Sequence, residues 1–184
     1  MDPDPKSDFE YLVGTAEKIR TEYLDICQAE WAASPLNWIR QVSSANKKGK
    51  IGERLVMAWA RDAGFAVRPR VHRGHDCVIA GAKVEVKLSL RWNSGTFTFM
   101  EIRDFDYDVA ALLGIAPSET YLWIVPKHIL LSNAPMQRRG ASGRGSQWVQ
   151  FPSGRTPDWL QRWGGTFAQA REALPQARQY RTFC

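Results

Sequence analysis

Two carboxylates and one lysine stand at a spacing that a β-hairpin can bring together. Asp76, Glu85 and Lys87 lie in the segment GHDCVIAGAKVEVKLS, and its Gly81-Ala82 pair suits a tight turn because glycine accepts positive φ. Side chains alternate between the two faces of a strand, so the three charged groups would share one face. Carboxylates are hard oxygen donors that suit Mg²⁺, and a neighbouring ammonium group could orient a water or offset negative charge. The spacing therefore predicts metal-assisted attack on a phosphodiester.

The predicted hairpin has strands at residues 77–80 and 83–90. Its two-residue turn would pair Asp76 with Lys87 and Val78 with Glu85. Charges gathered at the open end of an apolar hairpin are costly to hold without a ligand, although an ordinary ion pair at a sheet edge is an alternative explanation. The opposite face is apolar and is predicted to be core: Cys77, Ile79, Val84, Val86 and Leu88.

The spacing D-x8-E-x-K across a hairpin resembles the PD-(D/E)XK nuclease superfamily, with His75 in the place where the motif name has proline. The resemblance covers residues 47–127. The segments that carry it are GKIGERLVMAWARDAGF before the hairpin, and EVKLSLRW, FTFMEIRDFDYDVAALLGI and TYLWIVPK from the hairpin onwards. These segments are similar to a group of short restriction-endonuclease-like proteins.

The resemblance implies a role for each charged residue of the hairpin. Asp76, Glu85 and the backbone carbonyl of Val86 would hold Mg²⁺, with Mn²⁺ as an expected substitute, and Lys87 would position the attacking water. Glu53, in the first helix, matches an additional acid near the metal. The alternative for Glu53 is a solvated residue in the first turn of a helix, where the macrodipole favours an acid. Cleavage would leave 5′-phosphate and 3′-hydroxyl ends.

The surrounding pattern predicts the fold that such a site needs. The predicted class is α/β (α+β), a restriction-endonuclease-like core with a central mixed sheet flanked by helices in the order αβββαβ. The segment SANKKGKIG, residues 44–52, is predicted to be a loop that enters a helix, and this helix is apolar nearly all round and therefore mostly buried. The predicted core elements are a helix at 51–63, a strand at 65–71, the hairpin, a strand at 96–102, a helix at 104–113 capped by Asp104 and stopped by Gly114, and a buried strand at 121–125.

Three regions are predicted within what we expect to be one compact domain. Residues 1–45 form a helical N-terminal extension that could dimerise, 46–130 form the nuclease core, and 131–184 form a basic C-terminal extension. In that extension, residues 148–151 predict a short strand and residues 157–160 a turn or short helix. A last helix at 167–174 would be capped by Thr166 and followed by Pro175.

The charge of the chain is uneven and favours a polyanionic partner. The first 35 residues hold eight acids and three bases, whereas residues 127–184 hold nine bases and two acids. Lys and Arg contacts to phosphate dominate nucleic-acid affinity, so double-stranded DNA is the expected partner. An Arg-rich surface or a basic loop with no partner is the alternative. Direct readout commonly uses Arg, and the predicted DNA contacts are Arg91, Trp92, Arg138, Arg139, Arg144 and Arg155.

Other chemistries find less support. The motif H-x2-H-x-C formed by His72, His75 and Cys77 lacks the second ligand pair of a structural zinc site. The alternating acids at 104–108 lack the glycine and distal Glu of a calcium loop, and are predicted to be helix N-terminal acids. No P-loop, Rossmann fingerprint or Ser-His-Asp elbow is present. Three scattered cysteines, no secretory signal and no apolar run of about 20 residues predict a cytoplasmic protein.

The predicted function is a Mg²⁺-dependent endonuclease, most similar to a small type II restriction enzyme that cuts double-stranded DNA at a specific sequence. A homodimer is expected, because each chain has one site and two sites are needed to cut both strands. A cognate DNA methyltransferase of the same system is also an expected partner. The alternatives are a structure-selective or repair nuclease, such as a junction resolvase or nicking subunit, and a non-catalytic DNA-binding protein of the same fold. RNA is not excluded as a substrate by the residues.

Overall fold

The computed structural model describes residues 13, 26–70, 74–137 and 146–180. A six-stranded sheet has the order β1-β2-β3-β5-β6-β9, and a three-stranded sheet has the order β4-β8-β7. The strands are β1 (Val67–Pro69), β2 (Cys77–Ile79), β3 (Ala82–Leu90), β4 (Thr96–Ile102), β5 (Val109–Ile115), β6 (Thr120–Pro126), β7 (Met136–Gln137), β8 (Ser146–Pro152) and β9 (Gly164–Gly165). The helices are α2 (Ile26–Ala33), α3 (Asn37–Gln41), α4 (Ala45–Asp62), α5 (Lys127–Asn133), α6 (Asp158–Gln161) and α7 (Phe167–Gln179).

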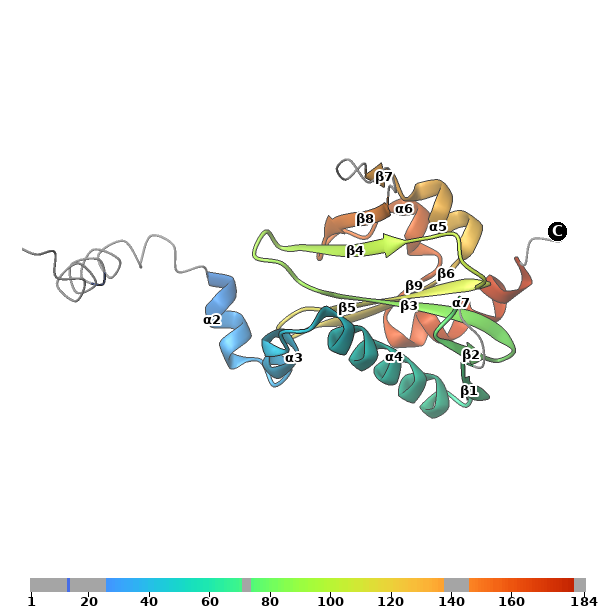
Figure 1. The fold of residues 1–184 in the computed structure, drawn as a ribbon, viewed down its shortest axis with the longest axis horizontal. Coiled ribbons are helices and arrows are strands. Elements are labelled where there is room, and N and C mark those ends of the chain that lie inside the picture. Colours follow the sequence, from blue (N-terminus) through green and yellow to red (C-terminus); the bar gives the residue numbers. More distant parts are fainter. Residues whose placement is uncertain (1–12, 14–25, 71–73, 138–145, 181–184) are drawn as a thin grey trace, which may run out of the picture.

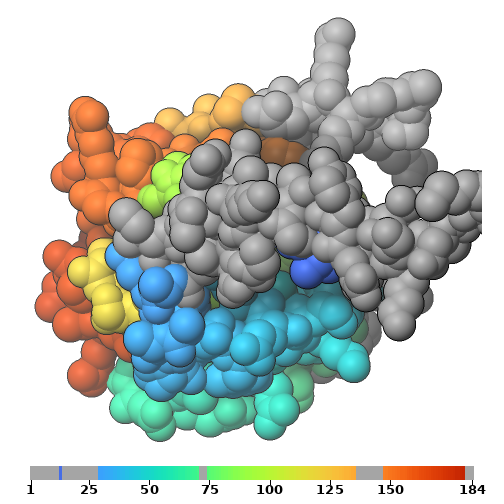
Figure 2. Space-filling view, turned by 90° about the vertical axis from the view of Figure 1, so that its left-hand side faces the viewer, coloured from blue at the N-terminus to red at the C-terminus, as the bar shows by residue number. Residues whose placement is uncertain are grey.

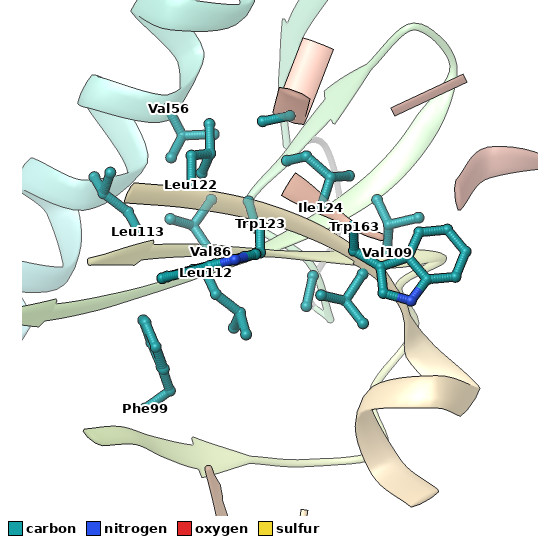
Figure 3. Packing of buried hydrophobic residues seen from close by; sticks show 14 of the residues in the cluster. Val56, Val86, Phe99, Val109, Leu112, Leu113, Leu122, Trp123, Ile124 and Trp163 are labelled. Carbon is teal, nitrogen blue, oxygen red and sulfur yellow. The ribbon is translucent and has the colours of Figure 1, made fainter. Parts of the chain in front are cut away.

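The six-stranded sheet is covered on both faces. Helices α4 and α7 pack on one face and the β4-β8-β7 sheet packs on the other (Figure 1). Figure 3 shows Val56 of α4 on the same side of the sheet as Leu113 and Leu122, with Phe99 of β4 on the opposite side. Gly52 allows α4 to approach β3 closely, because a Cβ at this position would lie 2.9 Å from the Cβ of Leu88. The two layers bury one continuous apolar core.

Helix α4 begins earlier than predicted and buries only one face. The side chain of Ser44 caps it by accepting a hydrogen bond from the Lys47 backbone at 3.3 Å, so the segment predicted as a loop is helical. Gly52, Val56 and Ala60 are buried, whereas Leu55 is 39% exposed. The prediction of a mostly buried helix was wrong because apolar residues also occupy its outer face.

The prediction of a helix at residues 104–113 was also wrong. Residues 109–115 form strand β5, which is buried along its whole length and pairs in parallel with β3. A strand covered on both faces is apolar at successive positions, as a buried helix can be, so the sequence VAALLGI did not distinguish the two. The predicted order αβββαβ is therefore corrected, since α4 is followed by β1 to β6 without an intervening helix. The β4 segment forms the crossover that parallel pairing of β3 with β5 requires.

Several remaining elements are as predicted. Strands β4, β6 and β8 include the predicted strands at 96–102, 121–125 and 148–151, and α6 is the predicted short helix. Helix α7 has the predicted cap, in which Thr166 and Gln169 form a reciprocal capping box, but it continues through Pro175 to Gln179. Strand β1 is shorter than predicted at three residues. Within the described residues, no helix is long and apolar enough to cross a membrane.

Helices α2 and α3 cover the end of the molecule where β3 leads into β4. Figure 2 shows α2 and α3 in blue and the start of α4 in cyan on one face, with the turn between β5 and β6 in yellow beside α2. Arg40 of α3 donates a hydrogen bond to the side chain of Asn93 at 2.9 Å, and Trp31 of α2 is buried. These contacts attach the helical segment to the loop that follows β3.

The hairpin turn lies one residue earlier than predicted. Ile79 pairs with Ala82, so the turn residues are Ala80 and Gly81, with φ of 50° and 81°. Positive φ at both positions is the geometry of a type I′ turn, which follows the twist of the two strands. Glycine adopts this geometry freely, but Ala80 has a Cβ and is strained there.

Replacing Ala80 with Asn is expected to stabilise the protein, because Asn tolerates the left-handed conformation and Asn-Gly is a favoured type I′ pair. We expect the free energy of unfolding to rise by about 0.5–1 kcal/mol. Urea denaturation of Ala80→Asn beside wild type measures the change, and Ala82→Asn serves as the control because Ala82 is buried in a strand and should be destabilised. A less stable Ala80→Asn variant would contradict the turn geometry.

Candidate active site

The charged residues of the hairpin share one face, as predicted, although their register differs from the prediction. Cys77 pairs with Val84, which places Asp76 opposite Glu85 rather than opposite Lys87. The displacement equals two residues, so it leaves every side chain on its predicted face. Cys77, Ile79 and Val84 are fully buried on the other face.

Asp76 closes the end of the hairpin with two hydrogen bonds. Its backbone nitrogen donates to the carbonyl of Val84 at 2.8 Å, and its Oδ2 accepts from the backbone nitrogen of Val86 at 2.8 Å. Strand β2 pairs with β3 only as far as Val84, so β3 has an open edge from Val86 onwards. Backbone groups two residues apart point to the same side of a strand. The carbonyl of Val86 is therefore directed to this open edge beside Asp76.

Glu85 and Lys87 form a half-buried ion pair on the same strand. Their Oε1 and Nζ atoms are 2.8 Å apart, and their side chains are 14% and 18% exposed. Burial raises the pKa of Glu85, and the charges of Asp76 and Glu53 raise it further, whereas the Lys87 ammonium lowers it. The net direction is upward, so the lysine does not fully compensate the cost of an ionised carboxylate at this position.

Glu53 approaches the same region from α4. Its carboxylate forms an ion pair with Lys50, at 2.6 Å between Nζ and Oε2, and its side chain is 14% exposed. The charge of Glu53 raises the pKa of Glu85 and that of Cys77. The structure thus brings together all four residues predicted to be catalytic, with Glu53 held by a lysine on its own helix.

The donor set at the open edge of β3 fits a magnesium ion in its chemistry. Asp76 and Glu85 supply carboxylate oxygens and Val86 supplies a carbonyl oxygen, while burial, with the nearby charges of Asp76 and Glu53, raises the pKa of Glu85 and so disfavours its ionised form. Mg²⁺ keeps several waters and needs only one or two protein carboxylates. In the described ranges, no group of three or more His, Cys, Asp or Glu side chains is arranged to hold a metal ion by itself.

The residues of the alternative metal motifs have other environments. Cys77 is buried, and burial together with the charge of Asp76 raises its pKa to about 12. His75 is buried too, and its Nδ1 has no hydrogen-bond partner among the described residues, while His72 lies outside them.

The three alternating acids precede β5, not a helix, so their predicted role as helix N-terminal acids was wrong. Asp104 pairs with Lys127 at 2.8 Å, and Asp106 pairs with Lys83 at 2.7 Å. Asp108 accepts a hydrogen bond from the Lys83 backbone at 2.7 Å. These bonds fix the loop before β5 against the start of β3.

The residues predicted to contact DNA have different surroundings. Arg91 forms an ion pair with Glu30, whereas Trp92 is 53% exposed and lines a hollow together with Arg40 and Lys48. Arg155 is exposed in the turn after β8. Arg138, Arg139 and Arg144 lie outside the described residues.

Two basic residues beside the site were missed by the sequence analysis. Lys48 lies at the start of α4 and lines the surface next to Lys87, and Arg40 lies at the far end of the same surface. Arg40 reaches the loop after β3 only through the tertiary structure, since its bonded partner Asn93 is 53 positions away. The run of lysines at 47–50 was the available signal, but it was interpreted as a loop.

Comparisons with known proteins identify a fold and no sequence family. The sequence matches no protein-family model and no curated protein. The structure is similar to that of a bacterial homing endonuclease, I-Ssp6803I, with a TM-score of 0.50 and 20% sequence identity. The similarity covers 74% of this chain and 96% of that chain. It confirms the predicted fold class, a mixed α and β fold with a central sheet flanked by helices that is similar to the fold of an endonuclease.

Proposed function

We propose that this protein is a metal-dependent DNA endonuclease of the PD-(D/E)XK type. The observation that carries the proposal is the group at the open edge of β3, where Asp76 is bonded to the Val86 backbone beside the half-buried Glu85–Lys87 pair. Burial raises the pKa of Glu85 even beside Lys87, and a bound cation would offset the cost of its ionised form. The fold, shared with an endonuclease, supports the same reaction class.

Each residue of the group has a chemical task in this proposal. Asp76, Glu85 and the Val86 carbonyl would hold Mg²⁺ or Mn²⁺, and Glu53 would support the ion through water. Bound there, the ion would polarise the scissile phosphate and stabilise the charge that develops during hydrolysis. The bond from the Val86 backbone fixes one oxygen of Asp76, so its second oxygen has a defined direction.

Lys87 is the residue that would act on the attacking water. Its ammonium group is held 2.8 Å from Glu85, so the position of its charge is fixed by the carboxylate of the same strand. From there it can orient a water by hydrogen bonding and offset the negative charge of the pentavalent transition state. Removing it should lower the rate and leave the metal ligands in place.

The finer features of the proposed function concern the substrate and the assembly. Double-stranded DNA is the proposed substrate, cut at a specific sequence as in type II restriction systems, with a methyltransferase protecting the same sequence. A homodimer would cut both strands, because each chain carries one group of catalytic residues. The basic charge of the chain, +6 in total, suits a polyanion.

Cleavage of supercoiled and mixed-sequence linear DNA, with Mg²⁺ and with EDTA, tests the proposal. Wild type is expected to give discrete Mg²⁺-dependent fragments, and Lys87→Ala is expected to lose about 10²–10⁴-fold in rate. Lys83→Ala is the matched control, because Lys83 lies on the same strand and face but pairs with Asp106 instead. Equal activity of the two variants would contradict the role of Lys87.

The same assay, run on linear and on branched DNA, distinguishes the related functions. Fragments with defined ends indicate a sequence-specific enzyme, whereas cutting confined to branched DNA indicates a structure-selective nuclease. Intact DNA in every condition, with binding retained, would overturn the proposed enzyme and leave a DNA-binding protein.

A further inference from the structure

A groove runs along the open edge of β3, away from the catalytic group. Two adjoining hollows form it, and they share Lys48, Leu88, Thr98 and Met100 in their walls. Its floor is β3 from Val86 onwards, one wall is the start of α4, and the other wall is the outward face of β4. Lys87 lines one end of the groove, and Arg40 and Trp92 line the other end.

The lining of the groove carries more basic than acidic side chains. Among the described residues that line it, five are Lys or Arg and one, Glu101, is an acid. Three of these cations are paired with acids: Lys87 with Glu85, Arg91 with Glu30, and Arg103 with Glu101. The basic lining residues are Arg40, Lys48, Lys87, Arg91 and Arg103.

Lys48 is the central cation of this lining because it borders both hollows. Its side chain is partly exposed, and no hydrogen bond or ion pair joins its ammonium group to another described residue. Lys47 and Lys50 lie in the same stretch of α4, and its first turn contains no acid. Lys50 is paired with Glu53, but Lys47 and Lys48 bring uncompensated positive charge to the positive end of the helix dipole, which is unfavourable for the helix alone.

Gly49 is a second unfavourable choice at the same place. It lies inside α4, where glycine is less stable than alanine, and it also lines the groove. A Cβ at Gly49 would meet no atom within 4 Å, and its φ is not in the left-handed region. Neither packing nor backbone conformation therefore requires glycine here, in contrast to Gly52 one turn later. Residues that weaken a helix are expected at positions where a ligand must fit.

We propose that this groove seats the sugar–phosphate backbone of the DNA strand that reaches Lys87, an assignment that rests on the proposed endonuclease function. Lys48 contacts a phosphate of that strand, and Gly49 leaves room for the strand to lie against α4. Arg40 extends the same basic path towards Trp92 at the far end. The groove thus sets the direction in which the strand leaves the catalytic group.

Substitutions at Gly49 separate DNA binding from stability. Gly49→Ala should raise Tm by about 2–4 °C, because the site is open and alanine favours a helix, yet weaken binding of a fluorescein-labelled mixed-sequence duplex. Gly49→Leu should weaken binding about 10-fold or more through its larger side chain. Ala58→Leu is the matched control, since Ala58 is exposed on the same helix, nine residues away and thus on its opposite side. Fluorescence anisotropy in EDTA measures the affinity without cleavage.

The salt dependence of binding tests the phosphate contact of Lys48. Lys48→Gln should lower affinity and reduce the slope of log K against log salt by about 1 between about 50 and 200 mM. Arg171→Gln on α7, an exposed cation outside the groove, should leave the slope unchanged.

The outcomes distinguish the groove from the proposed function as a whole. Wild-type affinity and salt slope in both Gly49→Leu and Lys48→Gln, in a protein that cleaves DNA, would overturn the groove and leave the endonuclease standing. A wild-type protein that neither binds nor cleaves the duplex would overturn both. Weaker binding by the two groove variants, with both controls unchanged, would establish the path.

Discussion

Glu85→Gln is expected to abolish DNA cleavage while leaving the protein at least as stable as wild type at pH 8. Glutamine keeps the shape of the side chain and can still accept a hydrogen bond from Lys87, but it removes the charge that would bind a metal ion. The loss of cleavage should be about 10³-fold or more, since metal ions contribute several kcal/mol of transition-state stabilisation. The stability should not fall, because the pKa of Glu85 is raised by burial and its ionised form therefore opposes folding.

The pH dependence has a definite sign. Below the ordinary pKa of 4.5, Glu85 is protonated in both the folded and unfolded states and has no effect on stability. As the pH rises from there to the raised pKa of the folded state, the unfolded chain releases its proton first, so the free energy of unfolding decreases. Above the folded pKa the cost is constant. The Gln variant lacks this decrease.

Thermal denaturation of both proteins from pH 4 upwards measures the effect. The Tm of Glu85→Gln minus that of wild type should become more positive as the pH rises above about 4.5 and then level off. Glu119→Gln is a suitable control, because Glu119 is exposed and distant from the site. A variant that is less stable than wild type at every pH would show that the Lys87 pair outweighs the burial of Glu85.

The catalytic group could be predicted from the sequence because alternation in a strand survives an error of register. The predicted turn at Gly81-Ala82 and the observed turn at Ala80-Gly81 differ by one residue, and the pairing therefore differs by two. Since the period of a strand is two, Asp76, Glu85 and Lys87 stay on one face in both registers. If the pairing had differed by one residue instead, Asp76 would lie on the opposite face from Glu85 and Lys87.

The elements after the hairpin were harder to predict because local signals were ambiguous. Asp104 and Gly114 suggested the two ends of a helix, but Asp104 pairs with Lys127 instead and Gly114 accommodates the ring of Phe97. A Cβ at Gly114 would lie 3.0 Å from that ring, so this glycine serves packing between the two sheets. Contacts between distant segments decided the outcome, and a single sequence does not display them.

The groove was missed for a related reason. Its basic residues come from α3, the start of α4, β3, the loop after β3 and the segment after β4, and only the fold places them along one edge. The lysines at 47–50 looked like a loop because glycine and clustered charge disfavour a helix. Within α4, the same glycine and lysines are the residues from which we infer that a DNA strand lies against this part of the helix.

Asp76→Asn should separate the structural role of Asp76 from its proposed role as a metal ligand. The amide oxygen of Asn can still accept the hydrogen bond from the Val86 backbone, which now measures 2.8 Å, so the hairpin should keep its stability. Its charge is lost, and cleavage should fall about 10³-fold or more. Asp76→Ala loses the bond as well, and its free energy of unfolding should be about 1–3 kcal/mol lower than that of Asp76→Asn, because the Val86 N–H is left without its partner.

Metal binding gives a readout for these variants that does not depend on cleavage. Mg²⁺ that binds the folded state should raise the Tm of wild type in a concentration-dependent way. Asp76→Asn should show a much smaller rise although it unfolds at the wild-type Tm without metal, whereas Lys87→Ala should keep the rise because it retains the carboxylates. If Asp76→Asn responded to Mg²⁺ as wild type does, Asp76 would be a structural residue of the hairpin, and the metal would have to be held elsewhere.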